Sequence, residues 1–160
     1  DCKPNWIITN KRYFLDPKKK KKMKKKGYVD YIKLKISGGK FTGVSRPGDD
    51  KQKIQESQAM QGSCWCMSRK WWDEVIGELQ TEGYGPLIQD SHEMVFKTWK
   101  AGGKLMVSKN TWHAHKHRSF ARTHNNGTPE NPANCDAGYK YAIDTWGNYF
   151  NELQEQWKKP

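Results

Sequence analysis

The segment from Gly62 to Arg118 carries the strongest local pattern of the chain. It begins with a strand-like run that ends at Ser68, whose hydroxyl is placed to cap the first turn of a helix. The apolar residues that follow have helical spacing and form one apolar face; they are Trp71, Trp72, Val75, Ile76 and Leu79. A short strand followed by an amphipathic helix is therefore expected here.

A second helix is predicted after the turn Gly-Tyr-Gly-Pro at 83–86. Asp90 opens this helix, and Gly102-Gly103 is typical of its end. Lys104–Ser108 then has the composition of a strand. Three alternate histidines follow this strand, and they would share one face of an extended chain; they are His113, His115 and His117.

The composition limits the class of protein. A chain of 160 residues fits one domain, 1–160, and its eight Trp, seven Tyr and five Phe can fill a core although only 34% of the residues are apolar. No apolar run approaches the length of a membrane-spanning helix, and no signal peptide is visible. Asp1 is not a Met, so the chain is expected to be processed or a fragment. The four cysteines favour reduced thiols and a cytoplasmic setting.

The net charge of +12 is concentrated in one lysine-rich run. Lys18–Lys22 and Lys24–Lys26 supply eight positive charges, and the remainder of the chain carries +4. Such a block repels itself, so a solvated, mobile loop is predicted over 18–26. The alternative is an electrostatic clamp on phosphates that is blind to sequence. No RNA-recognition, helix-turn-helix or zinc-finger pattern accompanies it.

The remaining segments have weaker patterns. Asn5–Asn10 and Tyr31–Ile36 are predicted strands. Ser37–Gln61 is expected to be a loop region, either a flexible lid or an acceptor-side insertion. Residues 119–138 are predicted to form an irregular active-site loop, and 139–157 the last helix, packed back on the core.

The order of these parts resembles the C-terminal half of a family 2 glycosyltransferase with the GT-A fold, a group that includes the polypeptide N-acetylgalactosaminyltransferases. The match lies in the order of residues over about sixty positions rather than in any one of them. The matching residues are Gly62, Trp65, Met67, Arg69, Trp71, Trp72, Glu74, Gly77, Gly83, Tyr84, Gln89, Asp90, Glu93, Lys97, Trp99, Gly102, Gly103, His115 and Arg118. The resemblance implies an α/β fold, the C-terminal part of GT-A, with a mixed sheet and flanking helices.

The resemblance also implies a reaction, the transfer of a sugar from a nucleotide-sugar donor such as a UDP-sugar to an acceptor, with Mn²⁺ as the cofactor. It assigns His115 as a metal ligand and Asp90 and Glu93 as catalytic carboxylates. Asp90 would stay ionised at a helix N-terminus. Many inverting members place a second acid where this chain has Ser91, so the stereochemistry is open. The alternatives are that His115 is simply exposed or hydrogen-bonded and that Asp90 only caps its helix.

Further residues are implied to bind substrate. Tyr84, Gly85 and Gln89 would lie beside the sugar, Trp65 would stack on a sugar face, and Arg118 would hold the diphosphate. A tryptophan in a strand is more often part of the core, and an arginine is as often a solvated charge. A zinc site built from the histidines together with Cys64 and Cys66 is a weaker alternative, because these spacings are not the usual zinc spacings.

One part of the family pattern is absent. A GT-A enzyme begins with a nucleotide-binding half that ends in Asp-x-Asp or Asp-x-His, and this chain matches only the acceptor side. We therefore expect a nucleotide-binding N-terminal half to complete the site, and the isolated chain to be inactive or very weak. The acceptor stays open among a DNA base, a protein hydroxyl, a lipid and a saccharide, and the lysine run favours an anionic one. The alternative function is a non-catalytic module that binds a polyanion or a glycan on a transferase-derived scaffold.

Overall fold

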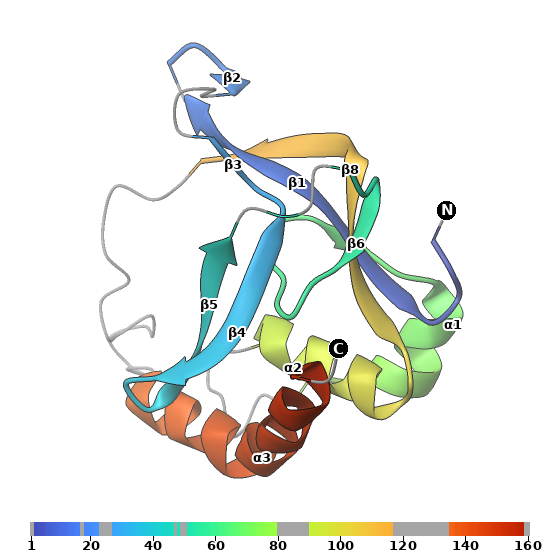
Figure 1. Ribbon diagram of the computed structural model, residues 1–160, viewed down its shortest axis with the longest axis vertical. Helices are drawn as coiled ribbons and strands as arrows, with labels where there is room; N and C mark the ends of the chain where they lie inside the picture. The colour runs from blue at the N-terminus through green and yellow to red at the C-terminus, as the bar shows by residue number, and fades with distance from the viewer. Residues whose placement is uncertain are drawn as a thin grey trace.

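The computed structural model describes residues 2–16, 18–22, 27–46, 48, 51–79, 90–116 and 135–158, and Figure 1 shows a sheet and a hairpin with helices along one side. The main sheet contains β1 (Trp6–Asp16), β2 (Lys21–Lys22), β3 (Tyr28–Val29), β6 (Ile54–Glu56), β7 (Trp65–Cys66) and β8 (Lys104–His115). The separate hairpin consists of β4 (Tyr31–Ser37) and β5 (Lys40–Arg46). The helical segments are α1 (Arg69–Trp71), the π-helix η2 (Trp72–Ile76), α2 (Asp90–Lys100) and α3 (Cys135–Trp157). The predicted α/β class, with a mixed sheet and helices, is confirmed.

The two long strands β1 and β8 form the centre of the main sheet. They pair in parallel, from Trp6 opposite Lys104 to Phe14 opposite His115, with an irregularity between Asn10 and Lys11. Strands β2, β3 and β7 pair with β1, and β6 pairs with β8, all of them antiparallel. Because β1 and β8 are parallel, their carboxyl ends lie at the same edge of the sheet. The strands predicted over Asn5–Asn10 and Lys104–Ser108 are confirmed, and both are longer than expected.

Helix α2 lies between two apolar clusters. Met94 and Val95 pack with Ile7 of β1 and Leu105 of β8. Phe96 is fully buried in the second cluster, among residues of the hairpin and of α3. The predicted start at Asp90 is confirmed. The predicted end is confirmed as well, since Gly102 has a φ of 75° and a Cβ on Gly103 would lie 2.4 Å from the Asn5 carbonyl oxygen.

Helix α3 covers the hairpin of β4 and β5 (Figure 1). Its aromatic side chains pack on α2, where Trp146 stacks on Phe96 with centroids 5.4 Å apart and Trp157 meets Trp99 edge-on at 5.0 Å. Aromatic side chains bury large areas, which is how a chain with few aliphatic residues builds this core. The predicted helix over 139–157 is confirmed, and it begins earlier, at Cys135.

The prediction of a loop over Ser37–Gln61 is wrong, because β5 and β6 lie within it. Strand β5 pairs with β4 along its whole length, and Phe41 is buried. Gly38 and Gly39 both have positive φ, as a two-residue hairpin turn of type I′ requires. Gly43 contributes too, since a Cβ there would lie 2.6 Å from Ile32 across the hairpin. The glycines suggested a loop, but they are what lets two strands pair closely.

The helix after Ser68 is capped as predicted and then changes its geometry. The Ser68 hydroxyl accepts a hydrogen bond from the Trp71 amide at 3.1 Å and donates one to the Pro4 carbonyl at 2.9 Å. After Trp71 the chain continues as the π-helix η2 and stops at Gly77, which has a φ of 57°. Leu79 lies beyond the helix but still packs on the apolar cluster beneath it.

Two other predicted segments are described only in part. Within 18–26, Lys21 and Lys22 form β2 opposite Leu15 and Asp16, while 23–26 lie outside the described residues. Within 119–138, the last four residues belong to α3 and the others lie outside the described residues. Among the described helices, none is long and apolar enough to cross a membrane.

Candidate functional site

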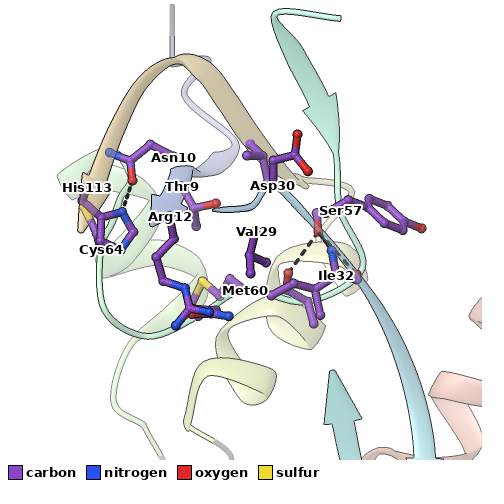
Figure 2. A pocket seen from close by; sticks show the side chains of 14 residues that line it. Thr9, Asn10, Arg12, Val29, Asp30, Ile32, Ser57, Met60, Cys64 and His113 are labelled. Carbon is purple, nitrogen blue, oxygen red and sulfur yellow. Dashed lines mark hydrogen bonds between the residues drawn. The ribbon is translucent and has the colours of Figure 1, made fainter. Parts of the chain in front are cut away.

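A small polar pocket lies between β1, β8 and the start of the hairpin (Figure 2). The polar side chains that line it include Asn10, Arg12, Asp30, Ser57 and His113. In open α/β sheets, ligands bind beyond the carboxyl ends of the strands. Arg12 and His113 come from the carboxyl-terminal halves of β1 and β8, and Asn10 lies near the middle of β1. The volume of about 20 Å³ admits about one water molecule. A sugar nucleotide therefore does not fit inside the pocket.

His113 is held at both ring nitrogens. Its Nδ1 pairs with Oδ1 of Asn10, and its Nε2 lies 3.0 Å from the Ser63 hydroxyl (Figure 2 shows the first bond). Since an amide oxygen only accepts, Nδ1 carries the proton and Nε2 accepts from Ser63. Burial, then Arg12, then His115 lower the pKa of His113. The ring is therefore neutral at pH 7.

The order of hydroxyl, imidazole and amide in Ser63, His113 and Asn10 has the form of a nucleophile, a base and an orienting group. Asn10 differs from the usual carboxylate in that it carries no charge to stabilise an imidazolium. The positive charge of Arg12 also acts against protonation of the ring. This arrangement therefore fixes the ring more than it activates the hydroxyl.

A buried ion pair joins the pocket's wall to β8. Nζ of Lys109 lies 3.3 Å from a carboxylate oxygen of Asp30, and both side chains are buried. The Gly48 amide also donates to Asp30 at 3.0 Å. Nearby, the Ser57 hydroxyl accepts from the Ile32 amide at 3.1 Å and donates to the Ala59 carbonyl at 3.0 Å. These contacts hold the start of the hairpin against the main sheet.

The structure places the predicted metal ligand and the predicted carboxylates on different elements. His115 is exposed at the end of β8, and Asp90 is half-buried at the start of α2. Glu93 is buried and forms a 2.8 Å ion pair with Lys97, whose Nζ also donates to the carbonyls of Ile76 and Glu78. The pocket is lined by His113 and not by these three residues.

The predicted substrate-binding residues are described only in part. Tyr84, Gly85, Gln89 and Arg118 lie outside the described residues. Trp65 lies on β7, partly exposed, and its ring stacks on Trp72 with centroids 6.0 Å apart and planes inclined by 6°. One face of Trp65 is therefore covered by protein, and sugar stacking on this residue stays a prediction.

The described residues do not by themselves fit a complete metal site. In the part of the chain that the structure describes, no three His, Cys, Asp or Glu side chains gather as ligands. His115 would thus supply one ligand to Mn²⁺, with the others coming from outside these residues. The zinc alternative fits less well, because both ring nitrogens of His113 are already used by Asn10 and Ser63. Cys64 and Cys66 are free thiols.

His92 is a second perturbed histidine, on α2. Its ring stacks on Phe41 with centroids 6.0 Å apart. Burial lowers the pKa of His92 to about 4, although the charge of Asp90 acts in the opposite direction. This ring is therefore neutral at pH 7 and serves the core between α2 and the hairpin.

Sequence patterns missed most of the pocket. Asn10, Arg12 and Ser63 were not candidate site residues, and they meet only because β1, β7 and β8 are neighbours. Asp30 did leave a signal, since a charged residue within the run Val-Asp-Tyr-Ile is buried only when it is paired. Its partner Lys109 lies far away in sequence and is not part of such an apolar run.

Comparison with protein families and with curated proteins found no match to this chain.

Proposed function

We propose that this chain forms the acceptor-side part of a metal-dependent glycosyltransferase that uses a nucleotide-sugar donor and has a GT-A-like fold. The observation that supports the proposal is the topology around α2. This helix leads directly into β8, the parallel partner of β1, so Asp90 begins the crossover helix and His115 ends the strand that follows. The sequence resemblance assigns the acid and the metal ligand in this order, and Asp90 and His115 lie on two consecutive elements of the structure.

In this proposal, Asp90 accepts the proton of the acceptor hydroxyl. Asp90 lies in the first turn of α2, at the positive end of the helix dipole. Glu93 has a different role, because its ion pair with Lys97 ties α2 to η2 and thereby positions Asp90. His115 would hold the divalent cation together with ligands from the nucleotide-binding half. A bound cation would supply charge to the leaving diphosphate.

The test is to express the complete open reading frame that contains this chain and to measure release of UDP from UDP-sugars with Mn²⁺ present. Asp90→Asn should lower kcat by about 100-fold or more, as expected for loss of a general base. His115→Ala should raise the Mn²⁺ concentration needed for half-maximal rate. Lys35→Gln, on the exposed face of the β4–β5 hairpin, is the control and should change neither quantity.

Full activity of Asp90→Asn would remove that residue from the mechanism. An open reading frame that encodes no nucleotide-binding half, with no UDP release, would overturn the proposal as a whole.

A further inference from the structure

Three aromatic rings lie side by side where β1, β3 and β8 run together. Tyr13 is at the centre, with its centroid 5.6 Å from that of Tyr28 and 5.7 Å from that of Trp112. Tyr13 and Tyr28 are register partners, and Trp112 pairs with Lys11 on the neighbouring strand. Trp112 is 48% exposed and Tyr28 is 38% exposed, so the two outer rings of this row face solvent.

Lysine side chains lie directly against these rings. Nζ of Lys22 is 4.2 Å from the Trp112 centroid and 4.7 Å from that of Tyr13, and Nζ of Lys11 is 4.2 Å from that of Tyr28. None of the described carboxylates forms an ion pair with Lys11 or Lys22. Lys18–Lys21 add exposed charge to the same end of the sheet, where β2 projects beyond the other strands (Figure 1).

We propose that this aromatic–lysine surface, formed by Tyr13, Tyr28, Trp112, Lys11 and Lys22, binds single-stranded nucleic acid without sequence preference. Exposed rings offer stacking platforms to unpaired bases, and the lysines track the phosphates. An exposed cation–π contact is weak. A phosphate can therefore pair with each ammonium group in place of the ring, and a base can then stack on the ring face. A duplex does not satisfy this surface, because its base faces are covered by their neighbours. The proposal does not depend on the proposed transferase activity.

The first test removes the rings. Binding of a fluorescein-labelled 15-nucleotide DNA strand of mixed sequence is measured by fluorescence anisotropy at 50 and 200 mM KCl. The double variant Tyr28→Ala/Trp112→Ala should weaken binding by about fivefold or more. Tyr28→Phe/Trp112→Phe keeps the rings and should retain the affinity. Trp6→Ala removes an indole that lies under Nζ of Lys3, 5.2 Å away, at the start of β1. It is the control for loss of an indole and should bind as the parent does.

The second test removes the charges. Lys11→Gln/Lys22→Gln should reduce the slope of log K against log salt by about 1.4, since each phosphate contact on a single strand contributes about 0.7. Lys33→Gln/Lys35→Gln removes the same charge from exposed positions on β4 and should leave this slope nearly unchanged. Equal effects of the two pairs would mean that net charge alone drives binding, and the proposed surface would be wrong.

Two competitors test the ligand class. Matched duplex DNA should compete poorly with the labelled strand, and so should heparin once its charge concentration is matched. Unchanged binding by Tyr28→Ala/Trp112→Ala would overturn the role of the rings. Stronger competition by heparin, with the same dependence on Tyr28 and Trp112, would assign the surface to an anionic glycan and overturn the nucleic-acid proposal.

Discussion

Glu93 is predicted by resemblance to be catalytic, whereas its surroundings give it a structural role, and Glu93→Gln separates the two. The side chain is 3% exposed and its carboxylate lies 2.8 Å from Nζ of Lys97, which is 25% exposed. Lys97 also donates to the carbonyls of Ile76 and Glu78, at 2.9 Å each. Through Lys97, the carboxylate links α2 to the end of η2. Removing the carboxylate should therefore lower the free energy of unfolding.

The size of the effect follows from the burial of this pair. Removing one partner of a buried ion pair costs about 3–5 kcal/mol, because the other charge is left unpaired. Lys97 keeps two carbonyl acceptors and some contact with solvent, so we expect Glu93→Gln to cost about 3 kcal/mol, the lower end of that range. Lys97→Met removes the charge from the other side. The double variant should be less unstable than the sum of the two, by about 0.5–3 kcal/mol.

The assay is urea unfolding followed by tryptophan fluorescence. With a slope of about 2–3 kcal/mol/M, the Glu93→Gln midpoint should fall by about 1 to 1.5 M. The matched control is Glu74→Gln, because Glu74 forms an exposed ion pair with Lys70, 3.8 Å apart, at the same helical spacing. Exposed pairs contribute about 0–1 kcal/mol, so the control midpoint should move little.

The structural interpretation would be refuted if Glu93→Gln unfolded at the urea concentration of the parent, or if the double variant showed no coupling. Glu93 would then return as a candidate for catalysis, and its effect on UDP release could be interpreted without a correction for unfolding.

Two further predictions follow from side chains described above. The pKa of His92 is about 4 in the folded chain, against 6.5 for a free histidine. Between these two pH values the unfolded chain therefore binds more protons than the folded chain. The contribution of the neutral His92 ring to stability is thus present above pH 6.5 and is lost as the pH falls towards 4. His92→Phe keeps the ring against Phe41 and should remove about 3 kcal/mol of this acid sensitivity in urea unfolding at pH 7, 5.5 and 4.5, and an unaltered pH dependence would contradict the assignment. Burial, and next the neighbouring Cys66, raise the pKa of the Cys2 thiol, which is hydrogen-bonded to Cys66. Diamide at pH 9 should therefore form a Cys2–Cys66 disulfide, detected by non-reducing peptide mapping; Cys64→Ser should leave this cross-link intact, and a product that contains Cys64 would disprove the pairing.

The parts of the fold that could be predicted are those with local causes. The Ser68 cap, the start of α2 at Asp90 and its end at Gly102-Gly103 all follow from hydrogen bonding or backbone conformation within a few residues. The spacing of apolar residues by three and four positions, from Ile143 to Trp157, likewise predicted α3. Each of these signals lies within a single element, which is why the sequence reveals it.

The parts that could not be predicted depend on distant partners. Strand β5 contains few apolar residues, and its pairing becomes visible only through the glycine turn and the burial of Phe41. The extension of β1 beyond Asn10 depends on β8, which is much later in the chain. The pocket is harder to predict than the strands, because Asn10 and His113 come from β1 and β8 and Asp30 forms its ion pair with Lys109 of β8. Periodicity within one segment cannot predict contacts between residues that are distant in sequence.

The parallel pairing of β1 and β8 has a consequence for synthesis of the chain. Asn5, just before β1, contacts the Gly102 carbonyl just before β8, and these two residues are 97 positions apart. At about 5–20 residues per second, a ribosome takes roughly 5 to 20 seconds to add that stretch. During this interval β1 can pair only with β2, with β3 and, once it has been synthesised, with β7, and the edge that will meet β8 stays open. Nascent chains are thus most exposed to aggregation in this interval, and slowing translation between β3 and β8 should lower the soluble yield.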